Sequence, residues 1–144
     1  MDNLNNQNIE GLWLAPEHFH LMQADVGSRA PEEACGIVAG KAGHILKVYP
    51  ATNALHSLVR YQLDPQELLE IFNEIDQMGW DLIGIYHSHP NGPNHPSATD
   101  IQEAYYPDSV YIIWAQSGGK WNFRGFYIRD GEFTEIPINI SSLD

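Results

Sequence analysis

Three candidate metal ligands lie within one short stretch of the sequence: His87, His89 and Asp100. The two histidines follow an apolar run that predicts a strand, and on a strand residues two apart point to the same face. Imidazole is a good ligand for zinc. Two neutral imidazoles and one carboxylate form an open zinc site in which water takes the fourth position, as in catalytic zinc sites. The stretch therefore predicts a site for one zinc ion.

The residues around this stretch also have a purely structural interpretation. A His-x-His pair alone fits two polar residues at the end of a strand. Ser97 precedes Asp100 by three positions and follows Pro96, which is the pattern of a capping box at the start of a helix. A capping role is compatible with metal binding, because a helix N-terminus stabilises the ionised carboxylate that a metal ion needs. The carboxylate close to the pair favours a metal site.

Hydrolysis at such a site also needs a general base for the bound water. The sequence has no His-Glu-x-x-His motif, and its single cysteine, Cys35, excludes the Pro-Cys-x-x-Cys pattern of zinc deaminases. Glu32 and Glu33 are the best candidates, because they begin a run of small and apolar residues that predicts a central strand, residues 31–40. Neighbouring strand residues face opposite ways, so only one of the two can reach the metal. The alternative is that both are solvated.

The remaining pattern predicts one mixed α/β domain that positions these residues. We expect about three helices, within residues 15–28, 64–79 and 97–105. Strands are expected at residues 11–14, 31–40, 44–50, 58–63, 80–86, 109–115, 121–128 and 133–136.

The composition excludes several classes of partner. Seven basic against 19 acidic residues give a net charge of -12, which argues against nucleic acid and against an anionic membrane surface. One cysteine excludes an intramolecular disulfide framework. No apolar run is long enough to span a bilayer, and the polar residues 1–10 lack the positive region of a signal peptide. We expect a cytoplasmic protein with a flexible leader at 1–10 and one domain over 11–144.

Two parts of the sequence together resemble a known family. His87-Ser88-His89, seven residues, Ser97, two residues and Asp100 match the JAMM motif of the JAMM/MPN+ metalloproteases without deviation. The segment 31–40 is similar to that family's upstream Glu-x-Cys-Gly-apolar segment. The resemblance extends over roughly residues 13–136, which is nearly the whole chain.

The resemblance implies a role for each site residue. His87, His89 and Asp100 would be the zinc ligands. Glu33 would be the general acid and base, with Glu32 facing away, and Ser97 would donate a hydrogen bond to the oxyanion. The implied fold is a curved mixed β-sheet flanked by helices and related to cytidine deaminases.

The resemblance also implies a substrate class. Eukaryotic members of the family cleave isopeptide bonds to ubiquitin, and prokaryotic members act on ubiquitin-like sulfur-carrier proteins or their adducts. The compact length looks like the stand-alone prokaryotic type. Two alternatives stay open, a zinc hydrolase of small amides or peptides and a non-catalytic MPN-like scaffold that binds proteins. For His95, on the loop between the ligands, a solvated position and a substrate contact both remain possible.

Overall fold

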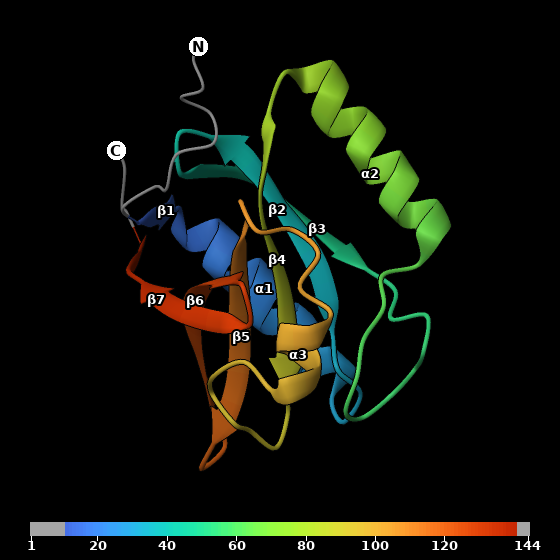
Figure 1. Cartoon of the computed structure of the whole chain (residues 1–144), viewed down its shortest axis with the longest axis vertical. Helices are drawn as coiled ribbons and strands as arrows, with labels where there is room; N and C mark the ends of the chain where they lie inside the picture. Colours follow the sequence, from blue (N-terminus) through green and yellow to red (C-terminus); the bar gives the residue numbers. More distant parts are fainter. Residues whose placement is uncertain (1–10, 141–144) are drawn as a thin grey trace.

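The structure, a computed structural model, describes residues 11–140 of the chain. In this part, eight strands form one mixed sheet in the order β7-β6-β5-β4-β2-β3-β1-β8, flanked by three helices (Figure 1). The predicted mixed α/β fold is confirmed. The predicted leader, residues 1–10, lies outside the described residues, and the domain limits stay a prediction.

The bounds of the strands and helices fix where the site residues lie. The strands are β1 (Leu12–Leu14), β2 (Cys35–Lys41), β3 (His44–Ala51), β4 (Asp81–His89), β5 (Val110–Ser117), β6 (Lys120–Arg129), β7 (Glu132–Ile136) and β8 (Ile138–Ile140). The helices are α1 (Pro16–Arg29), α2 (Pro65–Met78) and α3 (Ala98–Gln102).

Strand β4 carries the two histidines of the motif at its carboxyl end, in the middle of the sheet. It pairs antiparallel with β2, which sets Cys35 opposite His87, and parallel with β5. Tyr86 packs in the core cluster with the buried residues of α1, and Ile85 packs in a separate cluster with residues near α3. Because side chains alternate along a strand, His87 faces the same side as Ile85. Figure 1 shows α1 and α3 on opposite sides of the sheet.

Strand β2 has a glycine, Gly36, where the ring of Tyr86 from β4 packs against it. A Cβ atom at Gly36 would overlap the ring of Tyr86, the residue just before the first histidine. Cys35 is fully buried, and burial raises the pKa of its thiol to about 12. The side chain is therefore a neutral packing group and is neither a nucleophile nor a thiolate ligand.

Helix α2 begins and ends at the residues that the sequence indicates. The Asp64 carboxylate accepts hydrogen bonds from the backbone N–H groups of Gln66 and Glu67, at 2.8 and 3.3 Å. Gly79 ends the helix in the left-handed conformation, with φ of 70°, which glycine adopts without steric cost. The helix buries Ile71 and Ile75 against β2 and β3.

Two predicted elements differ clearly in the structure, and one observed strand was not predicted. Residues 58–63 are not a strand, since only Leu63 forms a bridge, with Asn53, while the side chain of Asn53 bonds the backbone at Arg60 and Gln62. The last helix, α3, ends at Gln102 and does not reach residue 105. Strand β8 was not predicted; it is three residues long and pairs with β1.

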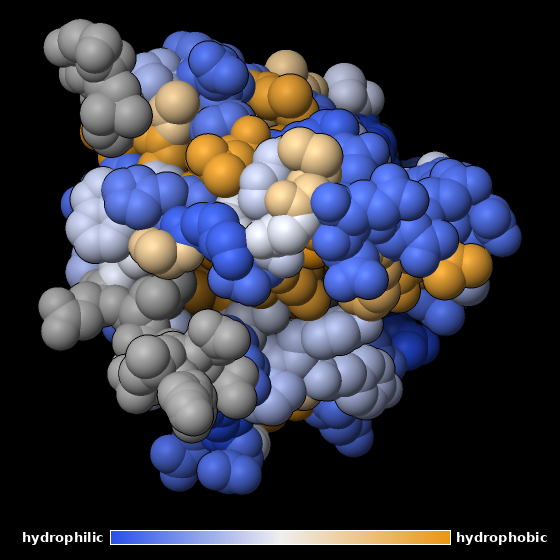
Figure 2. Space-filling model, turned by 90° about the horizontal axis from the view of Figure 1, so that it is seen from above, coloured by the Kyte–Doolittle hydropathy of each residue, from blue (hydrophilic) through white to orange (hydrophobic). Residues whose placement is uncertain are grey.

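The face in Figure 2 is mostly hydrophilic, with hydrophobic side chains in separate patches. No helix in residues 11–140 combines the length and apolar character that a membrane span requires.

Candidate metal centre and active site

The structure brings His87, His89 and Asp100 together at the end of β4 and the first turn of α3. The Nε2 atoms of the two histidines lie 3.1 Å apart. Asp100 faces both rings, with Oδ1 3.1 Å from His87 Nε2 and Oδ2 3.0 Å from His89 Nε2. All three residues are buried.

These distances fit a bound metal ion. Zinc holds nitrogen and oxygen ligands at about 2.0–2.1 Å in a tetrahedron, so neighbouring ligand atoms lie about 3.3 Å apart. The three separations, 3.1, 3.1 and 3.0 Å, are close to that value. The chemistry of this donor set, two imidazoles and a carboxylate, is that of a zinc site with an open position.

Hydrogen bonds at the end of β4 and the start of α3 hold His89 and Asp100 in this geometry. The Nδ1 of His89 lies 2.6 Å from the carbonyl oxygen of Pro93. A proton on Nδ1 donates to that oxygen and leaves the Nε2 lone pair for a metal, as is usual for metal-binding histidines. Ser97 and Asp100 form the predicted capping box: the Ser97 Oγ accepts from the Asp100 N–H at 3.0 Å, and Asp100 Oδ2 accepts from the Ser97 N–H at 2.9 Å.

Glu33 lies directly beside the cluster, although it precedes β2 and is not part of the strand. Its side chain is only 4% exposed, and its Oε1 atom has no hydrogen-bond partner in residues 11–140. Carboxylate and ring nitrogen atoms of Glu33, His87 and His89 lie within 4.8 Å of one another. Asp100 lies closer to both rings, at 3.1 and 3.0 Å from the two Nε2 atoms, so either carboxylate could complete a metal site with the two histidines.

Backbone pairing explains which of the two glutamates faces the site. The Ala34 N–H donates to the Ser88 Oγ at 2.8 Å, and the Ser88 N–H donates to the Ala34 carbonyl at 3.1 Å. These bonds continue the contact of β2 with β4 and direct Glu33 inward. Glu32 points outward, 3.4 Å from His56, with 38% of its side chain exposed. Ser88 is therefore a structural residue of the site that the sequence did not indicate.

Burial and charge set the protonation of the site. Burial raises the pKa of Glu33 to about 7, with Asp100 adding to the rise and His89 opposing it. Burial also lowers the pKa of His87, which keeps the ring neutral and able to bind a metal. For Asp100, burial is outweighed by the hydrogen bonds and charges of the two histidines, so its pKa is held well below the usual range.

His95 packs against the neighbouring hairpin. Its ring stacks on Phe133 of β7, with centroids 6.0 Å apart and planes 10° apart. On β6, Arg124 donates to the carbonyl and side-chain oxygens of Asn94, at 3.2 and 2.9 Å. The β6–β7 hairpin thus supports the loop between the candidate metal ligands.

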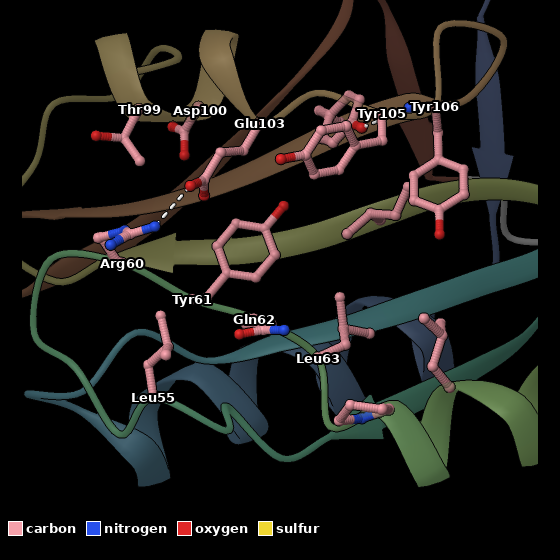
Figure 3. A pocket seen from close by; sticks show the side chains of 14 residues that line it. Leu55, Arg60, Tyr61, Gln62, Leu63, Thr99, Asp100, Glu103, Tyr105 and Tyr106 are labelled. Carbon is pink, nitrogen blue, oxygen red and sulfur yellow. Dashed lines mark hydrogen bonds and ion pairs between the residues drawn. The ribbon is translucent and has the colours of Figure 1, made fainter.

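A pocket of about 520 Å³ opens beside Asp100 (Figure 3). One wall comes from the segment before α2, with Arg60 and Tyr61, and the opposite wall comes from α3 and the residues after it. Arg60 and Glu103 form an ion pair across these walls at 2.6 Å. The sequence did not indicate this pocket, because its near wall is the segment that was predicted as a strand. The full lining is Leu55, Arg60, Tyr61, Gln62, Leu63, Pro65, Leu68, Ile85, Thr99, Asp100, Glu103, Tyr105, Tyr106 and Tyr111.

The chain is similar to characterised proteins over most of its length. The family model of prokaryotic homologs of the JAB domain matches residues 15–126. The desampylase of Haloferax volcanii is 41% identical over 91 residues, which are 61% of this chain and 66% of that protein. The CysO-cysteine peptidase of Mycobacterium tuberculosis is 35% identical over 76% of this chain and 77% of that protein.

A solved structure agrees with this similarity. Protein DSY2949 from Desulfitobacterium hafniense has a TM-score of 0.83 and 29% identity, over 92% of this chain and 94% of that one. The fold, the motif and the extent of the family match lead to the same conclusion. The chain belongs to the family of prokaryotic homologs of the JAB domain, which confirms the resemblance to stand-alone JAMM/MPN+ metalloproteases.

Proposed function

We propose that this chain is a zinc-dependent isopeptidase that cleaves at the C-terminal tail of a ubiquitin-like or sulfur-carrier protein. The observation that carries the proposal is the buried Glu33 carboxylate, which faces the cluster of His87, His89 and Asp100. The similarity to a desampylase and to a CysO-cysteine peptidase supports the substrate class. A cytoplasmic location remains part of the proposal.

The proposed chemistry assigns one task to each residue. His87, His89 and Asp100 would hold one zinc ion, with water as its fourth ligand. When bound, zinc supplies a Lewis acid that activates water and polarises the scissile carbonyl. Glu33 accepts the proton of the attacking water and then gives it to the leaving amine. A carboxylate with a pKa near 7 suits both steps, because it exchanges a proton readily at neutral pH.

The position of the pocket relative to Glu33 indicates how a bound substrate would be oriented. It borders Asp100, whereas Glu33 is absent from its lining. Because Glu33 protonates the leaving amine, the amine would lie on the Glu33 side, and the acyl tail of the carrier protein would lie in the pocket. The tyrosine and leucine side chains of the lining suit a tail with apolar residues before its C-terminus.

Ser97 is proposed to donate to the oxyanion. Its Oγ accepts a hydrogen bond from the Asp100 N–H, and no acceptor for its hydroxyl proton is found within residues 11–140, so the proton can be donated to substrate. We expect Ser97→Ala to lower kcat by roughly 100-fold, the typical effect of one oxyanion donor. Steady-state kinetics and zinc content test this. Zinc should stay bound, Ser97→Thr should restore activity, and an alanine variant with wild-type kcat would contradict the role.

The proposed function is tested by a cleavage assay with candidate carrier proteins as isopeptide conjugates and as C-terminal amino acid adducts. We expect release of the carrier with zinc present, loss of cleavage with a chelator, and recovery when zinc is added back. Small amides and free dipeptides serve as the comparison. Faster cleavage of the small amides would favour the alternative hydrolase, and zinc binding without any cleavage would favour a scaffold.

A further inference from the structure

The loop of residues 52–63 contacts both parts of the proposed catalytic apparatus. The Ser57 carbonyl accepts a hydrogen bond from the Glu33 N–H at 2.9 Å, and the Asn53 side chain donates to the Glu33 carbonyl at 3.0 Å. Farther along the loop, Tyr61 lies against His87. One segment therefore touches the proposed base and one proposed metal ligand.

The two histidines are held in different ways. A metal-binding histidine almost always donates its other ring N–H to a carboxylate, a carbonyl or water. His89 follows this rule through Pro93. The Nδ1 of His87 is buried and has no hydrogen-bond partner among residues 11–140. Instead, the ring of Tyr61 stacks on His87, with centroids 4.4 Å apart and planes 22° apart.

Such a stack favours the metal-bound form of the ring. A metal ion withdraws electron density from imidazole and makes the ring partly positive. The face of a phenol ring is negative, so its attraction for the imidazole increases when the metal binds. The stack also limits rotation of the His87 ring, which lacks the hydrogen bond that would otherwise fix its orientation.

Asn53 holds Tyr61 in place. It is 1% exposed, and its side chain makes four hydrogen bonds. Its side-chain oxygen accepts from the backbone of Leu55 and Gln62, and its amide donates to the carbonyl of Arg60. The backbone on both sides of Tyr61 is thus fixed by a buried side chain. The Tyr61 hydroxyl points across the pocket in Figure 3.

We propose that Tyr61 is a positioning residue for His87, and that its aromatic ring takes the place of the missing hydrogen-bond partner. The inference rests on the proposed function in one respect, that the three ligands bind zinc. The hydroxyl has a separate task, because it faces the space assigned to the acyl tail. The ring should therefore affect metal binding, and the hydroxyl should affect only KM.

Zinc affinity, measured on substrate-free protein by competition with a chelator, tests the proposal. Tyr61→Leu removes the ring, and we expect zinc to bind roughly 10- to 100-fold more weakly, the usual effect of losing a partner of a ligand. Tyr61→Phe keeps the ring and should bind zinc as the wild type does. The absorption spectrum of the cobalt-substituted protein should change in the leucine variant and return in the phenylalanine variant.

Tyr105→Leu is the matched control. Tyr105 lines the same pocket from the opposite wall and is 74% exposed, so the same chemical change should alter KM and leave zinc affinity unchanged. If Tyr61→Leu does not fold, Tyr61→Met takes its place. Equal zinc affinity in Tyr61→Leu and Tyr105→Leu overturns the proposal, and so does an equal loss in Tyr61→Phe and Tyr61→Leu. Cleavage is not used here, so a wild type that binds zinc and cleaves no carrier conjugate would refute only the proposed function.

Discussion

Replacing Glu33 with glutamine is expected to leave zinc bound and to lower kcat on a carrier-protein conjugate by roughly 1000-fold, within the range for loss of a general base. Glutamine keeps the shape of the side chain and cannot accept the proton of water. Burial of this position favours a neutral group, so the variant should be at least as stable as the wild type. Single-turnover kinetics together with zinc analysis measure both parts of the expectation.

Glu32→Gln provides the control for this experiment. It makes the same chemical change at the adjacent residue, whose side chain is 38% exposed and lies near His56. Its activity should remain close to that of the wild type. A Glu33→Gln enzyme as fast as Glu32→Gln would refute the assignment of the base.

Activity should increase with pH, because the proposed base must lose its proton before it can act. Glu33 is active as a carboxylate, so kcat/KM should rise with pH through the pKa of this group. Burial places that pKa at about 7, and the positive charge of bound zinc would lower it, so we expect the acidic limb of the profile at or below pH 7. That limb should be absent from the residual activity of Glu33→Gln.

The sequence predicted the cluster of candidate metal ligands because these residues lie in one continuous stretch. The spacing of His87, His89, Ser97 and Asp100 can be recognised without knowledge of the fold. Glu33 is different, since strand periodicity left it equivalent to Glu32. The pairing of Ala34 with the middle residue of the motif decides between them in the structure, and this pairing joins distant parts of the chain. Only the family resemblance indicated Glu33 beforehand.

The near wall of the pocket could not be predicted from the pattern of residues. Residues 58–63 have the composition of a strand, and periodicity reports only which side chains share a face. It does not show that the buried side chain of Asn53 supplies the hydrogen bonds that a neighbouring strand would supply. Tyr61 therefore appeared as an ordinary strand residue. Its contact with His87 depends on a loop conformation that the buried side chain of Asn53 holds in place.

Asp100→Asn should abolish zinc binding at concentrations that saturate the wild type. Removal of a partner of a ligand typically weakens metal affinity about 10- to 100-fold, and loss of the ligand's charge should exceed that. The loss is measured by zinc stoichiometry after dialysis, and by the thermal shift on adding zinc. At a zinc concentration 1000 times the Kd, the wild type should gain about 4 kcal/mol of stability, whereas the variant should gain none.

We choose asparagine over alanine because asparagine removes the charge of the proposed ligand and can keep the helix cap. Asp100 also accepts the Ser97 N–H in the capping box, and alanine would remove both roles, with a helix cap alone worth about 1 kcal/mol. The side-chain oxygen of asparagine can still accept that hydrogen bond, so α3 should remain and zinc loss cannot be attributed to a frayed helix. Asp108→Asn, at a largely exposed side chain, controls for the charge change. Wild-type zinc stoichiometry in Asp100→Asn would refute the ligand set, and the third protein ligand would then have to be Glu33.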